Sequence, residues 1–242
     1  MTAPFTWVSA SATAQGNVRD HNEDAVLELP ALGLWAVADG MGGHEAGDVA
    51  SRMIVEALCL VPRAQRLSEL LDSVEDHLRA VNQRLQGMSL ERGGALTGST
   101  VAVLLAHSNH CLSVWAGDSR VYRLRDGVLT QVTRDHTEAQ ELLDDGVLDA
   151  QDAAARCSTS NAITRAIGGA ADLYLDLELR ELRDGDRYLL CSDGLYKELN
   201  DGELVRLLVS QDVSGTCRGL MGRALAGPCR DNVSAVVVEF KS

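Results

Sequence analysis

Three short apolar segments of this chain end at an aspartate close to a glycine, and this repeated feature constrains the fold most. The segments are 34–38 before Asp39, 112–116 before Asp118, and 188–191 before Asp193. Each has the length and composition of a buried β-strand. One aspartate beside a glycine would alone indicate only a turn. Three of them indicate that the fold presents several carboxylates from strand ends, where functional loops gather on a rigid scaffold.

Further acids precede two other apolar segments. Glu23 and Asp24 come before 25–29, and Asp231 comes before the β-branched segment 233–240. If these ends meet, two carboxylates 4 Å apart repel by roughly 4 kcal/mol at an effective dielectric near 20. Four such groups together must take up protons or bind divalent cations.

The expected ligand set consists of oxygen atoms, which selects Mg²⁺ or Mn²⁺ over zinc or copper. Calcium stays an alternative, although the chain lacks an EF-hand loop. Two ions bridged by a water lower the pKa of that water and clamp phosphoryl oxygens. Arg19, shortly before Glu23, is suited to bind phosphate through its guanidinium fork. The residues alone therefore favour a two-metal phosphoester hydrolase.

Charge and cysteine usage exclude several other classes. The net charge of -13 over 242 residues argues against binding to nucleic acid or to anionic membranes. No apolar run approaches the roughly 20 residues of a membrane span, and the N-terminus does not resemble a signal peptide. None of the six cysteines forms a C-x-x-C pair, so neither zinc nor a disulfide framework is expected. We expect a cytoplasmic protein.

Periodicity predicts two antiparallel sheets covered by helices. Apolar residues three and four apart predict helices at 45–61, 67–85, 203–209 and 214–225, the last two capped by Asp201 and Ser214. Strands are expected at 5–14, 25–29, 34–38, 99–106, 111–116, 120–125, 128–132, 173–179, 187–191 and 233–240. The polar stretch 134–169 is expected to be a loop-rich surface insertion. This order favours an α+β fold in one domain, 1–242.

Taken together, these motifs resemble the metal-dependent protein phosphatases of the type 2C family, in its bacterial branch. The resemblance covers nearly the whole chain. Its motifs are R-D-H-N-E-D from Arg19, A-D-G-M-G-G from Ala38, L-T-G-S-T from Leu96, A-G-D-S-R from Ala116, S-N-A-I-T-R-A-I-G from Ser160, C-S-D-G-L from Cys191 and R-D-N-V-S from Arg230.

The resemblance implies a four-layer αββα sandwich and a role for each motif. Asp39 is similar to the carboxylate that bridges two metals, and Gly40 to the residue that offers a backbone carbonyl. Asp193 and Asp231 match the other ligands of the first metal, Glu23 and Asp24 the acids around the second, and Asp118 with Asp193 a third site. Arg19 matches the phosphate-binding arginine, and residues 136–160 match a flap that bears on substrate choice.

The activity implied is hydrolysis of phosphoserine or phosphothreonine in proteins by a water activated by two metal ions. Such a protein reverses a bacterial Ser/Thr kinase, acts on phosphoproteins that include this kinase, and is expected to be a monomer. One position departs from eukaryotic relatives, which carry a histidine after the Asp-Gly pair, where this chain has Met41. The general acid is then either His44 or water on a metal ion.

Several other motifs have simpler interpretations. The run from Gly93 to Thr100 resembles a P-loop but lacks its lysine. Cys217 and Arg223 have the spacing of a cysteine-dependent phosphatase loop but lie in an amphipathic pattern. His107 and His110 flank a hairpin turn. Arg120 is expected to pair with a nearby acid, and Lys197 and Glu198 to be surface residues.

Two competing functions remain at this stage. One is a catalytically inactive relative that only binds a partner, which the complete set of acids argues against. The other is a phosphatase for a regulatory partner of a sigma factor, which the absence of an attached sensor segment makes the weaker reading.

Overall fold

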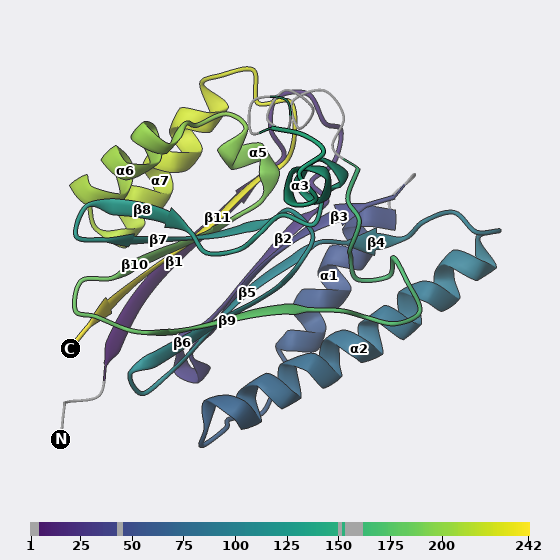
Figure 1. Ribbon diagram of the computed structural model, residues 1–242, viewed down its shortest axis with the longest axis horizontal. Helices are drawn as coiled ribbons and strands as arrows, with labels where there is room; N and C mark the ends of the chain where they lie inside the picture. The colour runs from purple at the N-terminus through teal and green to yellow at the C-terminus, as the bar shows by residue number, and fades with distance from the viewer. Residues whose placement is uncertain (1–4, 43–45, 150–151, 153–161) are drawn as a thin grey trace.

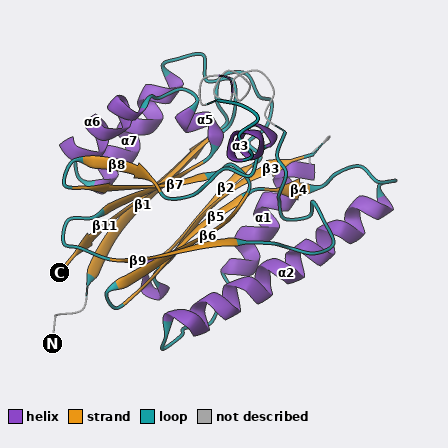
Figure 2. Ribbon diagram, viewed as in Figure 1, coloured by secondary structure: helices purple, strands orange, loops and turns teal. Residues whose placement is uncertain are grey.

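The structure is a computed structural model that describes residues 5–42, 46–149, 152 and 162–242. Its strands form two antiparallel sheets (Figure 2). The first sheet has the order β1-β11-β10-β7-β8, with β1 Thr6–Ala14, β11 Val233–Lys241, β10 Arg187–Cys191, β7 Arg120–Arg125 and β8 Val128–Gln131.

The second sheet has the order β2-β3-β5-β6-β9. Its strands are β2 Asp24–Leu29, β3 Leu34–Met41, β5 Val101–His107, β6 His110–Ala116 and β9 Asp176–Glu181, and the short β4 Gly98–Ser99 pairs with the end of β3. A one-turn helix, Pro30–Leu32, joins β2 to β3.

Helices cover both outer faces of this pair of sheets. Figure 1 shows α1 Ala46–Leu58 and α2 Leu67–Glu91 on one side, and α6 Asp201–Ser210 and α7 Val213–Leu225 on the other. The shorter α3 Glu138–Asp144 and α5 Asp193–Tyr196 lie near the end of the sheets that β3 reaches. The expected αββα sandwich is confirmed.

The position of strand β3 between the helices and the other sheet explains why its sequence is apolar on both faces. Leu34, Ala36 and Ala38 pack toward α1 and α2, whereas Trp35 and Val37 pack between the sheets. Alternate residues of a strand point to opposite faces, so a strand covered by a helix on one side and a sheet on the other has no polar face.

The central core between the sheets is aromatic. Trp35 of β3, Tyr188 of β10 and Phe240 of β11 are fully buried there, and Phe240 meets both other rings edge to face. Such offset contacts stabilise ring pairs beyond their buried area. This core holds the two sheets face to face and so sets the position of their ends.

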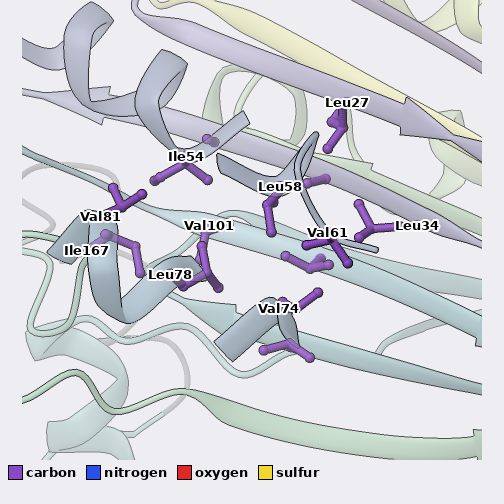
Figure 3. Close-up of a cluster of buried hydrophobic side chains, with 14 of the residues drawn as sticks. Leu27, Leu34, Ile54, Leu58, Val61, Val74, Leu78, Val81, Val101 and Ile167 are labelled. Atoms are coloured by element: carbon purple, nitrogen blue, oxygen red, sulfur yellow. The ribbon is translucent and has the colours of Figure 1, made fainter. Parts of the chain in front are cut away.

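Two outer cores attach the helices. On one face the apolar stripes of α1 and α2 meet the second sheet, as Figure 3 shows for Ile54, Leu58, Val74 and Leu78 around Val101. On the other face α6 and α7 pack Leu204, Leu208, Leu220 and Ala224 onto the first sheet.

Several local predictions were wrong. Asn200, not Asp201, caps α6 through a reciprocal pair with Glu203, and Asp212, not Ser214, caps α7 through the amide of Gly215. In both cases the residue with extended backbone just before the helix accepts the bond, as an N-cap requires.

The two ends of the stretch 134–169 are also less superficial than expected. The stretch contains α3, and its ends are buried at Asp135, His136, Thr137 and Ile167. The expected strand at 173–179 is observed as Asp176–Glu181, because pairing with β6 sets its limits. Among the residues described, no helix is long and apolar enough to span a membrane.

Candidate metal and phosphate site

Asp24 and Asp39 lie directly opposite each other on the neighbouring strands β2 and β3. Asp24 lies two residues from Val26 on β2, and Asp39 lies two residues from Val37 on β3. Residues two apart on a strand share a face, and both valines pack between the sheets, so the two aspartates also point into that space. Like charges at directly opposed positions destabilise a sheet. The pair is therefore a cost to folding that only a ligand or a proton offsets.

Asp24 is held from the opposite sheet. Its Oδ2 accepts hydrogen bonds of 2.7 Å from the hydroxyls of Ser192, which follows β10, and Ser234 of β11. Its Oδ1 is buried and, within the described part of the chain, has no hydrogen-bond partner. The side chain is thus fixed on one oxygen and leaves the other for a ligand.

Burial and mutual repulsion raise the pKa values of these acids. Burial raises the pKa of Asp24 to about 7, with contributions from the charges of Asp193 and Asp231, although the two serine hydroxyls oppose the shift. The pKa of Asp39 is raised well above its usual range by burial and then by Asp24, Asp193, Asp118 and Asp231. Four carboxylates from distant parts of the sequence therefore act on Asp39.

Asp118 is the third acid of this group and is only 2% exposed. Burial and Asp193 raise its pKa to about 7. The hydroxyl of Tyr196 donates to the backbone oxygen of Asp118 at 3.0 Å, and Arg120 lies over the Tyr196 ring at 3.6 Å from its centroid. Arg120 in turn makes a forked ion pair with Asp135, so its predicted structural role is confirmed.

Two cations hold the remaining acids. The Nε and a terminal nitrogen of Arg19 donate to the two oxygens of Asp231 at 2.8 and 2.9 Å, and this contact raises the pKa of Arg19. The ammonium of Lys197 pairs with Asp193. Lys197 is therefore part of the site rather than a plain surface residue, which corrects the sequence-based interpretation. Its signal was present, since it lies four residues after Asp193 on a helical turn.

Glu23 and Gly40 are held by close backbone packing. The amide of Gly40 donates to the carbonyl of Glu23 at 3.1 Å. A Cβ on Gly40 would lie 2.1 Å from the carbonyl oxygen of Gly47, so only glycine fits there. Glu23 Oε1 would lie 2.8 Å from a Cβ on Gly47, which shows that α1 packs directly against this acid.

Asn232 was not predicted as a site residue, although it lies in the R-D-N-V-S motif. Its side-chain oxygen accepts from the amide of Glu23, and its side-chain nitrogen donates to the carbonyls of Gln15 and His21, all at 2.9 Å. It thereby ties the segment that carries Arg19 to the start of β11. The only sequence signal was its place beside Asp231.

The donor set fits hard divalent cations. Asp24 Oδ1 and Asp193 Oδ1 are buried oxygens without a hydrogen-bond partner in the described part of the chain, and such groups are costly unless a ligand satisfies them. All predicted ligands are oxygen donors, which suit Mg²⁺ and Mn²⁺. Across the described residues, no group of three or more His, Cys, Asp and Glu side chains forms a ready-made metal site. His44, one of the two candidates for the general acid, lies outside the described residues.

The other motifs take structural roles. Gly98 and Ser99 form β4 and lead into a strand, whereas a P-loop would lead into a helix. Cys217 is buried within α7, and burial raises its thiol pKa to about 11, which opposes the thiolate that a cysteine-dependent phosphatase needs. His107 and His110 face each other at the β5–β6 turn.

Comparisons with known proteins agree with this geometry. A family model described as protein phosphatase 2C matches residues 14–218. The chain is 38% identical over 231 residues to the serine/threonine protein phosphatase PstP of Mycobacterium tuberculosis, covering 95% of this chain but only 44% of that protein. It is 32% identical to the serine/threonine phosphatase stp of Listeria monocytogenes, covering 94% and 93% of the two chains.

Solved structures give the same result. PppA, a regulatory component of the type VI secretion system in Pseudomonas aeruginosa, matches with a TM-score of 0.88 and 41% identity over 96% of this chain and 97% of that one. The catalytic domain of PstP with two manganese ions matches with a TM-score of 0.87 and 36% identity over 98% of this chain and all of that domain. By sequence, by fold and by the acids gathered at one end of its sheets, this chain belongs to the protein phosphatase 2C family.

Proposed function

We propose that this protein is a metal-dependent serine/threonine protein phosphatase that removes phosphate from phosphoserine and phosphothreonine in proteins. The observation that carries the proposal is the gathering of five acids in one site, where burial and the charges of neighbouring acids, Asp193 and Asp231 among them, raise the pKa values of Asp24, Asp39 and Asp118. Such a cluster must take up protons or bind cations at neutral pH, and its oxygen ligands suit divalent cations.

Each acid has a part in this proposal. Asp39 would bridge two ions, Asp193 and Asp231 would complete the first site with the carbonyl of Gly40, and Glu23 and Asp24 would hold the second. Asp118 with Asp193 would hold a third. Bound Mg²⁺ or Mn²⁺ ions would lower the pKa of an attacking water and neutralise the charge on phosphoryl oxygens.

Arg19 would position the phosphate. Its guanidinium is engaged with Asp231 through one forked contact, yet the side chain is 51% exposed, so its other donors are accessible to a phosphoryl group. The link through Asp231 would place that phosphoryl group beside the first ion. Protonation of the leaving hydroxyl would come from His44 or from water.

The expected setting follows from this activity. We propose that residues 1–242 form one catalytic domain with a flap at 136–160, working as a monomer in the cytoplasm against a cognate Ser/Thr kinase. The net charge of -13 and the acidic site suit a protein substrate rather than nucleic acid.

Hydrolysis of a small aryl phosphate and of a phosphoserine peptide tests this function directly. We expect turnover of both with Mn²⁺, none with chelator, and recovery when Mn²⁺ is returned. Full activity in chelator would remove the metal from the proposal. Turnover by the intact protein would also exclude the inactive binding module. Comparison of phosphoproteins in a lysate with and without the active protein then separates a general substrate range from a single sigma-factor regulator.

A further inference from the structure

A cavity of about 390 Å³, which none of the acids of the site lines, has no role in the chemistry described above. One of its lining residues is Met41, which lies two residues after Asp39 on β3. Consecutive Cα atoms are 3.8 Å apart, so the cavity begins within about 8 Å of Asp39 along the chain. Residues two apart on a strand share a face, so Met41 points to the same side as Asp39.

The lining of this cavity is largely apolar, and part of it is unusually exposed. Besides Met41 it includes Leu96, Ile163, Leu173 and Tyr174. Leu96 is 47% exposed and Tyr174 is 68% exposed. Single exposed apolar residues are common, but several that meet in one concave surface beside a reactive site indicate a binding site.

The cavity wall is built on the same backbone that holds the acids. Ile167 exchanges two backbone hydrogen bonds of 2.9 and 3.0 Å with Ser99, and Ser99 pairs with Gly40. Ile163 pairs with Thr137 at the other end of the wall. The cavity and the carboxylate cluster therefore keep a fixed spacing, as a subsite for a neighbouring residue of the substrate requires.

The charged residues of the cavity indicate which substrate side chains it disfavours. Arg165 is occupied by an ion pair of 2.9 Å with Asp176. Asp172 also lines the cavity, and within the described part of the chain it makes no ion pair or hydrogen bond. An acidic side chain in this subsite would meet the Asp172 carboxylate, while Arg165, the cation that lines the cavity, is already engaged by Asp176.

We propose that this cavity binds an apolar side chain of the phosphoprotein substrate, of leucine or methionine size, within two residues of the phosphorylated serine or threonine. An extended peptide advances about 3.4 Å per residue, so two residues span the distance from Asp39 to Met41. The inference rests on the proposed phosphatase function and adds a sequence preference to it. The cavity would favour substrates with an apolar residue at one fixed position and disfavour those with an acid there.

Phosphate release from a peptide series tests the subsite. Each peptide carries phosphoserine among glycines, with one leucine or one aspartate placed at a position from three residues before to three after. We expect leucine at one position within two residues of the phosphoserine to raise kcat/KM by about tenfold over glycine, equivalent to about 1.4 kcal/mol. Aspartate at that position should lower it below glycine.

Variants of the protein test whether the preference for leucine arises at this cavity. Leu96→Asp should remove the leucine advantage and leave turnover of the all-glycine peptide and of an aryl phosphate within about twofold, since neither reaches the cavity. Tyr174→Ala should reduce the same advantage. Leu90→Asp is the matched control, because Leu90 is 78% exposed and is not among the cavity residues, and it should keep the full preference.

The outcomes separate the two proposals. A flat profile across the series, with normal turnover, would overturn the subsite and leave the phosphatase intact. Loss of all substrates alike in Leu96→Asp would also overturn it. Failure of the unchanged protein to hydrolyse any peptide or aryl phosphate would remove both.

Discussion

At the scale of single residues, the site is built from side chains that are unfavourable where they stand. Asp39 is opposed by Asp24 across the strand pair, and burial and four neighbouring acids raise its pKa. Asp39→Asn keeps the shape and removes the charge. We expect turnover with Mn²⁺ to fall by more than about 100-fold, because even groups one step outside the ligands of a metal contribute about 10–100-fold.

Stability distinguishes this loss from misfolding. In chelator, Asp39→Asn should melt at or above the temperature of the unchanged protein, because a charge that its neighbours repel is gone. Asp212→Asn is the matched control, since asparagine caps α7 as well as aspartate does, and it should keep full activity. If Asp39→Asn retained more than about a tenth of the activity, Asp39 would not bridge the ions.

At the scale of elements, the one-turn helix α5 places the ammonium of Lys197 beside the acids of the site. Lys197 pairs with Asp193 four residues earlier. Burial opposes the charged form of Lys197, but the charges of Asp193, Asp118 and Asp231 outweigh it, so its pKa is raised. Lys197→Met should therefore tighten Mn²⁺ binding about fivefold, because a half-exposed pair contributes roughly up to 1 kcal/mol that Mn²⁺ must displace.

Calorimetric titration with Mn²⁺ measures this change. Lys241→Met is the matched control, because Lys241 pairs with Glu239 on β11 and should leave Mn²⁺ affinity unchanged. Weaker binding in Lys197→Met would mean that the lysine supports the ion rather than competes with it.

The segment between β8 and α3 contributes a second prediction through His136. Its Nδ1 accepts from the amide of Gly117 at 3.1 Å, and its ring stacks on Trp115. Burial lowers the pKa of His136, although Asp176 opposes the shift. The unfolded histidine, with a pKa near about 6.5, binds its proton more readily than the folded one, so the stability supplied is lost as pH falls through about 6.5.

Asparagine at this position keeps an acceptor for Gly117 and does not titrate. The melting temperature of the unchanged protein minus that of His136→Asn should therefore decrease between about pH 8 and about pH 5.5. Thermal melts at both pH values in chelator provide the measurement. A difference that grows toward low pH would show that the ion pair with Asp176 outweighs burial.

At the scale of the whole molecule, the acids couple stability to metal. They come from strands and turns of both sheets, so neutralising them joins the two halves of the sandwich. At a hundredfold excess over its Kd, a ligand adds about 2.7 kcal/mol to the free energy of unfolding. For a domain of this size that corresponds to a rise in Tm of about 5–10 °C.

Melting curves with chelator, Mn²⁺ and Mg²⁺ test this coupling without any substrate. The rise should disappear in Asp39→Asn. Equal melting temperatures in chelator and in millimolar Mn²⁺ would mean that the acids do not bind the ion together.

Most of the strands and helices could be predicted from the sequence because their signals are local. The apolar runs of β3, β10 and β11 and the stripes of α1 and α2 follow from strand and helix periods. The caps of α6 and α7 were misplaced by one and two residues, because neighbouring polar residues compete for the same amides and only the backbone decides which one accepts. The buried ends of 134–169 were missed because they lack periodicity.

The sequence by itself determined which residue types stand at the strand ends, and through their motifs the family. Only the tertiary structure decided what each acid contacts: Asp24 with two serines of the opposite sheet, Asp193 with Lys197, and Asp231 with Arg19. The reason is physical. Periodicity reports which face of one element is buried, whereas the packing of two sheets over Trp35, Tyr188 and Phe240 sets which ends meet and which charges act on one another.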